Sequence, residues 1–148
     1  MAGKYLVDTN IVMYAAGAEH PHKAPAVAFL ERVASGDLAA AVDSESLQEI
    51  LHRYRSIGRW DDGRRVYELT RRIFPHTIAI DDTITDRALV LMHTYSRLLA
   101  RDAIHAAVVL ARDLDGVCSF DRDLDGIRGV KRIEPKPAKP ATTGRKTR

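Results

Sequence analysis

Short apolar runs alternate along the chain with longer stretches in which apolar residues recur at helical spacing. A short apolar run bounded by polar or turn-forming residues is typical of a buried strand. The runs expected to form strands are Tyr5–Val7, Ala39–Val42, Thr77–Ile80, Val117–Phe120 and Val130–Ile133. All of them are short, so the sheet that they predict is also short along the strand direction.

The longer stretches predict helices, because their apolar residues fall three and four positions apart. These stretches are Ala26–Ala34, Ser46–Tyr54, Ile84–Tyr95 and Ala103–Ala111. The last one is apolar on nearly every side, which indicates a helix buried over most of its surface. Strands that alternate with helices form parallel sheets with helices on both faces. The predicted fold class is therefore α/β, a three-layer α/β/α sandwich with a short central parallel sheet.

Charge and proline divide the chain into two parts. Residues 135–148 contain three prolines, five basic residues and no acid, with too few apolar groups to offset the entropy of ordering. We therefore expect one domain over residues 1–134 and a disordered basic tail over residues 135–148. The chain has a net charge of +3, so subtracting the five tail cations leaves −2 for the domain. Two roles for the tail stay open: an inert extension, or an arm that contacts a nucleic-acid backbone or a partner.

The composition is that of an ordinary globular protein, with 45% hydrophobic and 29% charged residues. No apolar run approaches the roughly 18 residues that are needed to span a bilayer. The N-terminus lacks the apolar region and the cleavage site of a signal peptide. A single cysteine, Cys118, excludes a disulfide framework within the chain. Together these features predict a protein of the reducing cytoplasm with no membrane association.

Two acids, Asp8 and Asp121, each directly follow a predicted strand. Sites in open parallel sheets form beyond the carboxyl ends of the strands, where the strand order reverses. If the two strands are neighbours, the carboxylates repel each other, and a hard divalent cation relieves that repulsion. We therefore expect an oxygen-ligand site for Mg²⁺ (or Mn²⁺). Structural roles stay open beside this one: Asp8 as the N-cap of a following helix, and Asp121 as a turn residue.

Three further side chains bear on this site. Asp102 opens a predicted helix, where the helix dipole favours an acid and from which a carboxylate can also reach a cation at a strand end. His105 lies one turn further along the same face, and a packed or solvated histidine is the favoured interpretation over a catalytic one. Glu49 falls opposite the apolar stripe of its predicted helix, so periodicity alone predicts that it is exposed to solvent.

Other kinds of site are excluded by missing residues. Residues 121–126 begin like a calcium-binding EF-hand loop, but Arg132 stands where the loop needs its last acid. One cysteine and six scattered histidines offer no zinc-ligand spacing. Aspartyl-phosphate chemistry is disfavoured because position 10 is Asn10 and no lysine occurs between Lys23 and Lys131. The chain also lacks a glycine-rich phosphate loop and a serine in a nucleophile elbow.

Four segments, taken together, resemble the motifs of PIN domains. Asp8-Thr-Asn-Ile is similar to the opening signature, Ser46-Leu-Gln-Glu-Ile to the helical glutamate motif, Arg101-Asp-Ala-Ile-His-Ala-Ala to the third motif, and Ser119-Phe-Asp-Arg-Asp-Leu-Asp to the fourth. They stand in the family's order and cover residues 4–134. The resemblance implies that Asp8, Glu49, Asp102 and Asp121 are the catalytic residues and the metal ligands.

Within that family the small size is most similar to the VapC toxins of toxin–antitoxin pairs. The resemblance implies a PIN-like fold over residues 1–134 and an endoribonuclease that hydrolyses RNA with Mg²⁺ (or Mn²⁺). It also implies a homodimer that a cognate antitoxin neutralises. Auxiliary roles fall to Asn10 and Ser119, which would orient water or an outer-sphere ligand, and to Asp123 or Asp125. Two alternatives are a catalytically silent PIN scaffold that binds RNA or a protein partner, and a structure-specific DNA nuclease.

Overall fold

The computed structural model describes residues 4–137 of the chain. Its centre is a five-stranded sheet in the order β3-β2-β1-β4-β5, with every neighbouring pair parallel. The strands are β1 (Lys4–Val7), β2 (Ala39–Asp43), β3 (Thr77–Ile78), β4 (Gly116–Cys118) and β5 (Arg132–Ile133). All five predicted strands are therefore present, and each bound lies within two residues of the expected one.

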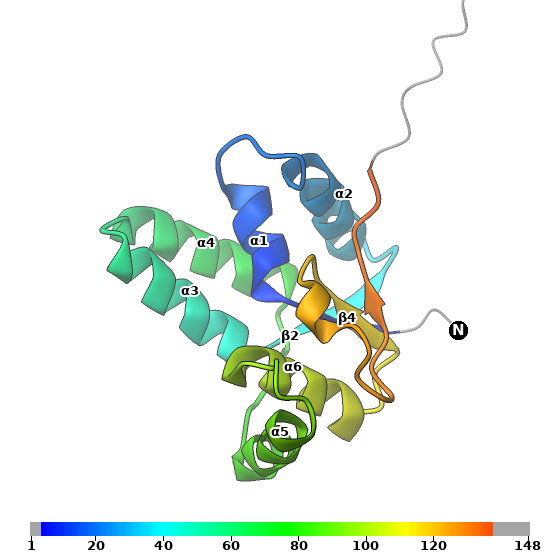
Figure 1. Cartoon of the computed structure of the whole chain (residues 1–148). Helices are drawn as coiled ribbons and strands as arrows, with labels where there is room; N and C mark the ends of the chain where they lie inside the picture. Colours follow the sequence, from blue (N-terminus) through cyan, green and yellow to red (C-terminus); the bar gives the residue numbers. More distant parts are fainter. Residues whose placement is uncertain (1–3, 138–148) are drawn as a thin grey trace, which may run out of the picture.

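The helices are α1 (Thr9–Ala16), α2 (Lys23–Ala34), α3 (Ser44–Ser56), α4 (Trp60–Ile73), α5 (Asp82–Thr94) and α6 (Ala100–Ala111), with a 3₁₀ turn η1 (Arg122–Leu124). Helices α1 to α4 cover one face of the sheet, and α5 and α6 cover the other (Figure 1). The three-layer α/β/α sandwich with a short parallel sheet is thus confirmed.

Alternating side chains of the central strands bind the two helical layers to the sheet. On β1, Leu6 packs into the cluster formed with α5 and α6, whereas Val7 packs into the cluster formed with α1 to α4. Its neighbour β4 repeats the alternation with Val117 and Cys118. This follows from strand geometry, because successive side chains point to opposite faces. The buried positions of β1 and β4 are therefore apolar toward both faces, as expected for parallel strands that are covered on both sides.

Two helices were not among the predicted elements. Helix α1 is short and begins as soon as β1 ends, at the segment where we had considered Asp8 as an N-cap. Helix α4 contains Gly63, which weakens a helical pattern in a sequence. In the structure, a Cβ atom at position 63 would lie 2.4 Å from the Cβ of Tyr54 on α3. The glycine therefore allows α3 and α4 to pack closely, and it does not end the helix.

The strand order places a reversal at the centre of the sheet. From β1 the chain proceeds outward through β2 and β3, then returns to the other side of β1 for β4 and β5. Val7 at the end of β1 is in register with Cys118 at the end of β4. The expectation that the strands before Asp8 and Asp121 are neighbours is therefore confirmed, and both acids leave the same edge of the sheet.

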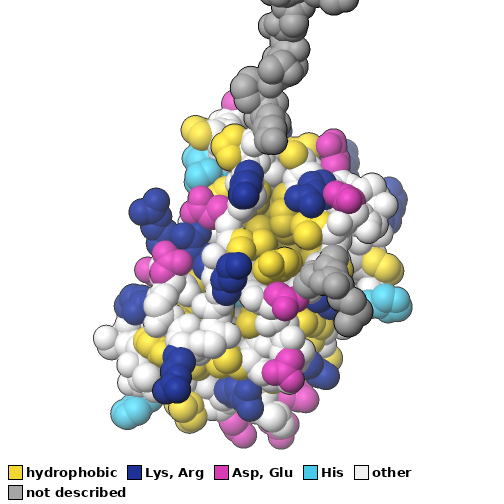
Figure 2. All heavy atoms as spheres, turned by 90° about the vertical axis from the view of Figure 1, so that its right-hand side faces the viewer, with side chains coloured by type: hydrophobic (Ala, Val, Ile, Leu, Met, Phe, Trp, Pro, Cys, Tyr) yellow, Lys and Arg dark blue, Asp and Glu magenta, His cyan; other side chains and the backbone are white. Residues whose placement is uncertain are grey.

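The face that carries β5 shows no large area of one charge. Figure 2 shows hydrophobic side chains gathered there, with Lys or Arg and Asp or Glu side chains mixed around them. Residues 135–137 follow β5 without regular structure, and the rest of the predicted tail lies outside the described residues. None of the helices described over residues 4–137 has the length and hydrophobicity needed to cross a bilayer.

Candidate metal centre

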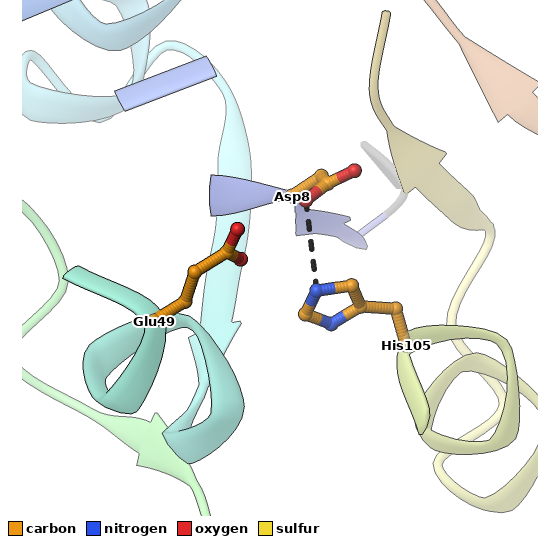
Figure 3. A group of neighbouring side chains, drawn as sticks. All are labelled: Asp8, Glu49 and His105. Atoms are coloured by element: carbon orange, nitrogen blue, oxygen red, sulfur yellow. Dashed lines mark ion pairs between the residues drawn. The ribbon is translucent and has the colours of Figure 1, made fainter. Parts of the chain in front are cut away.

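The acidic residues of four separate segments meet at the carboxyl edge of the sheet. Two groups of three side chains lie there. Within each group, one ligand atom from every residue lies within 4.8 Å of the others. One group is Asp8, Glu49 and His105, and the other is Asp102, Asp121 and Asp123. The first draws on the end of β1, on α3 and on α6 (Figure 3). The second draws on the first turn of α6 and on the segment after β4.

Asp8 occupies the N-cap position of α1, but its side chain makes no capping hydrogen bond. Its Oδ2 instead accepts a hydrogen bond from the Ser119 hydroxyl at 2.6 Å, and its Oδ1 lies 3.5 Å from Nε2 of His105. Only 6% of the residue is exposed. The capping role that we had left open is therefore not used by this side chain, which turns toward the centre.

Two predicted auxiliary residues, Asn10 and Ser119, connect the ends of β1 and β4. The amide of Asn10 donates to the Ser119 hydroxyl oxygen at 3.1 Å. That oxygen also accepts from the backbone N–H of Asp121 at 2.9 Å, while the hydroxyl proton goes to Asp8. Ser119 is fully buried. These bonds hold the carboxylates of two strands in one orientation, which corresponds to the outer-shell position that we had expected for both residues.

Glu49 is not exposed as its helical periodicity predicts. Its side chain is 15% exposed and forms an ion pair with Arg101, the residue before Asp102 on α6. The apolar periodicity shows which face of α3 packs against its own helical layer. It cannot show that α6 lies beside the opposite face, which carries Glu49. The position of Glu49 in the centre agrees with the motif resemblance.

Asp102 and Asp121 lie close together, with carboxylate oxygens within 4.8 Å of each other. Burial and the negative charges of Asp121 and Asp8 raise the pKa of Asp102 to about 7. Asp121 also caps η1 by accepting from the backbone N–H of Asp123 at 2.9 Å, so its turn role and its place in the centre coexist. Asp125 points elsewhere, because Arg132 holds its carboxylate at 2.7 and 3.2 Å.

The sequence analysis did not include Asp43, which the structure places behind the centre. Asp43 ends β2 and is fully buried, and its Oδ1 accepts from the backbone N–H of Ser46 at the start of α3. Its Oδ2 lies 2.7 Å from Nδ1 of His105. Asp43 directly follows the predicted strand Ala39–Val42, so the rule that selected Asp8 and Asp121 could also have selected it.

His105 is fully buried, so of the packed and solvated roles that the sequence analysis favoured, the solvated one is wrong. Burial by itself lowers the pKa of an imidazole, but the carboxylates of Asp43, Asp8 and Asp102 outweigh burial and raise the pKa of His105 to about 9. The ring therefore lies between two buried carboxylates, Asp43 on one side and Asp8 on the other.

A divalent cation fits the chemistry of these residues. Carboxylates held this close favour taking up a proton or a cation, and the raised pKa of Asp102 is the sign of that strain. Asp8, Glu49, Asp102 and Asp121 offer the oxygen ligands that hard dications bind, as the sequence analysis expected.

Comparisons with known proteins identify the family. The sequence model of the PIN domain matches residues 5–130. This chain belongs to the PIN-domain family. It is 39% identical over 128 residues to Ribonuclease VapC13 of Mycobacterium tuberculosis, which covers 86% of this chain and 98% of that protein. It is 31% identical over 121 residues to Ribonuclease VapC23 of the same species, with 80% and 93% covered. The resemblance seen in the four sequence motifs is thereby confirmed.

Solved structures of PIN-family fold agree with this assignment. A toxin–antitoxin complex from Klebsiella pneumoniae contains a chain with a TM-score of 0.64 and 21% identity, covering 90% of this chain and 99% of that chain. VapBC2 of Rickettsia felis, bound to a DNA fragment from its promoter, gives a TM-score of 0.70 at 15% identity, with 88% and 98% covered. At these identities the solved structures support the fold alone.

Proposed function

We propose that this PIN-family protein is a metal-dependent endoribonuclease that acts as the toxin of a toxin–antitoxin pair. One observation carries the proposal. Asp8, Glu49, Asp102 and Asp121 come from separate segments and converge at the switch edge of the sheet, in a chain that is 39% identical to proteins named VapC ribonucleases.

In this proposal the four acids are the catalytic metal ligands, and the cation is Mg²⁺ (or Mn²⁺). A bound dication lowers the pKa of a coordinated water and stabilises negative charge that develops on the phosphate. The protein's own contribution is positional. Ser119 and Asn10 fix the carboxylate of Asp8, and Asp123 adds a third carboxylate beside Asp102 and Asp121.

An acidic centre repels RNA, so basic residues must flank it. A cavity of about 450 Å³ borders the centre and is lined by Glu49, Tyr14 and the arginines Arg53, Arg59 and Arg101. Arg101 is half exposed while it pairs with Glu49, so it is positioned to exchange that partner for an RNA phosphate. We assign the RNA backbone to this cavity.

Cleavage of a labelled single-stranded RNA tests the activity. We expect cleavage with Mg²⁺ or Mn²⁺ and none with EDTA. RNA binding without cleavage under every divalent cation would instead support the silent scaffold. A preference for branched DNA over RNA would support the DNA nuclease, an alternative for which the described residues offer no arch or paired DNA-binding helices.

The antitoxin partner has a candidate docking surface on the layer of α1, α2 and α4. An apolar cavity of about 280 Å³ there is lined by Val12, Ala15, Leu30, Leu69 and Ile73 among others. Leu69 in this lining is 45% exposed, although it is a large apolar side chain. An amphipathic segment with a basic end could fill this cavity and place its charge among the carboxylates.

Expression in a bacterial host tests the toxin role. The wild type should arrest growth, Asp8→Asn should not, and co-expression of the neighbouring antitoxin gene should relieve the arrest. Leu69→Glu should remain toxic but escape the antitoxin. If the wild type is harmless at high expression, the toxin role is wrong even where RNA cleavage is measured in vitro.

We also propose a homodimer. Leu89, Val90 and Leu99 are each more than 60% exposed on α5 and at the start of α6, which is unusual for side chains of this size in the absence of a partner. Light scattering should give twice the monomer mass for the wild type. The double substitution Leu89→Lys and Val90→Lys should reduce the measured mass to that of one monomer.

The proposed site of action is the cytoplasm. RNA is present there, and its reducing environment agrees with the free, buried Cys118.

A further inference from the structure

His105 carries a buried nitrogen that the protein leaves without a hydrogen bond. The residue has 0% of its surface exposed. Its Nδ1 is bonded to Asp43, but its Nε2 has no hydrogen-bond partner within residues 4–137. Buried polar atoms are paired in most proteins, and an exception commonly marks a place where an ion or a reactant binds.

The unpaired nitrogen points into the metal centre. Nε2 faces Asp8, with Oδ1 of that carboxylate 3.5 Å away, and the carboxylate of Glu49 extends from α3 toward the same place (Figure 3). One ligand atom from each of the three residues lies within 4.8 Å of the others. These separations are short enough for the three residues to hold one cation between them.

Asp43 holds the ring in the form that a metal requires. The Nδ1–H donates to Oδ2 of Asp43 at 2.7 Å, so Nε2 is the nitrogen that a metal ion would bind in place of a proton. Asp43 is itself fixed, because it is fully buried and its Oδ1 caps α3 at Ser46. Metal-bound histidines almost always donate their second N–H to a carboxylate in this way.

Helix α6 presents both an acid and this nitrogen to the same edge. Asp102 and His105 are three residues apart, so they lie on one face of the helix. An acid and a histidine at this spacing serve as ligands of paired dications in helical carboxylate proteins. Asp102 belongs to the second group of ligand atoms, so one turn of α6 contributes to both groups.

We propose that Nε2 of His105 is a direct metal ligand together with Asp8 and Glu49, and that it makes the centre prefer a first-row transition dication such as Mn²⁺ over Mg²⁺. Imidazole nitrogen suits transition metals, whereas Mg²⁺ binds almost entirely through oxygen. The inference rests on the same centre as the proposed function. It concerns which atoms hold the ion, and it can be tested without RNA.

Pulsed EPR of the Mn²⁺-loaded wild type decides the question, because a directly bound imidazole gives a nitrogen hyperfine coupling. We expect that coupling in the wild type and in His93→Gln, which alters an exposed histidine on α5. We expect His105→Gln to bind Mn²⁺ more weakly, without the coupling, and with a smaller ratio of Mn²⁺ to Mg²⁺ affinity by calorimetry. Asp43→Asn keeps the histidine but loses its fixed orientation, so Mn²⁺ affinity should fall by about 10–100-fold.

The wild-type spectrum keeps the test decisive even if a variant at the buried position fails to fold. Bound Mn²⁺ without nitrogen coupling would overturn the inference and would make His105 a cationic spacer between Asp8 and Asp43. RNA cleavage alongside that result would leave the proposed function standing. Nitrogen coupling in a protein that cleaves no RNA would support His105 as a metal ligand and would contradict the proposed function.

Discussion

The metal centre has two halves: the first is Asp8, Glu49 and His105 with Asp43 behind them, and the second is Asp102, Asp121 and Asp123. The two halves relieve the repulsion between neighbouring carboxylates by different means. In the first half, Asp8 and Asp43 lie on either side of His105, and each is buried and hydrogen-bonded. In the second half, no cationic side chain of residues 4–137 lies between Asp102 and Asp121, and burial together with the neighbouring negative charges raises the pKa of Asp102 to about 7. The first half is built into the core, whereas Asp123 at the edge of the second half is exposed.

This difference shows how one site can combine rigidity with exchange. A carboxylate fixed by buried partners keeps its position whether or not a cation is bound. A carboxylate whose pKa is raised, such as Asp102, loses its proton when the cation binds, because metal ligands must be deprotonated. We therefore expect substitutions in both halves to reduce activity, and substitutions in the second half also to change the dependence of activity on pH and metal concentration.

The largest effect is expected for Asp8→Asn. Asparagine preserves the shape but removes the charge at the point where both halves meet, so RNA cleavage should fall by on the order of 100-fold or more. The fold should persist, since the Asp8 side chain caps no helix. Initial cleavage rates and thermal unfolding check both statements. Cleavage at the wild-type rate would remove Asp8 from the site.

Asp123 and Asp125 should differ, although both follow Asp121 closely in the sequence. Asp123 has a ligand atom near those of Asp102 and Asp121, so Asp123→Asn should lower cleavage by about 10-fold at limiting Mg²⁺ and less at saturating Mg²⁺. Asp125 is paired with Arg132, so Asp125→Asn should leave cleavage near the wild-type rate. Titrations with Mg²⁺ compare the two, and the opposite ranking would exchange their roles.

The second half should make the metal-free protein sensitive to pH. Because folding raises the pKa of Asp102 from 3.8 to about 7, the folded state holds a proton that the unfolded chain releases between these values. In EDTA, the contribution of Asp102 to the free energy of unfolding should therefore be most favourable below pH 4, and it should be lost as the pH rises toward 7. The side chain is partly exposed, so we expect on the order of 1 kcal/mol after allowance for solvent screening.

Denaturant unfolding in EDTA at a series of pH values measures this loss of stability. The Asp102→Asn substitution should make the free energy of unfolding less dependent on pH over this range. Asp86→Asn is the matched control, because Asp86 is exposed on α5. Added Mn²⁺ should restore stability at high pH in the wild type and in the control, but not in Asp102→Asn. A profile unchanged by Asp102→Asn would place the titrating group elsewhere.

The smallest effect is expected from the tail. Deletion of residues 136–148 removes all five tail cations, so RNA binding should weaken a few-fold at low salt while metal-dependent cleavage persists. The salt dependence of the RNA affinity should become shallower by about 0.7 for each lost phosphate contact. Filter binding between low and moderate salt measures both quantities, and an unchanged slope would make the tail an inert extension.

Much of this protein follows from its sequence alone. The short apolar runs predict every strand, and the acids that follow two of them predict an oxygen-ligand site at the carboxyl edge. The reason is local: a strand end is visible in the residues that form it, and all parallel strands deliver those ends to one edge. Helix α4 was not predicted, and only the packed structure shows that its Gly63 allows close contact with Tyr54 of α3.

Only the tertiary structure decided which side chains face one another across elements. Periodicity predicts an exposed Glu49, but Arg101 of α6 covers it. Asp43 and His105 are separated by 62 residues, and no local pattern links the end of β2 to the second turn of α6. Their pairing depends on how α6 packs against the sheet, and that packing leaves a buried histidine nitrogen open toward Asp8.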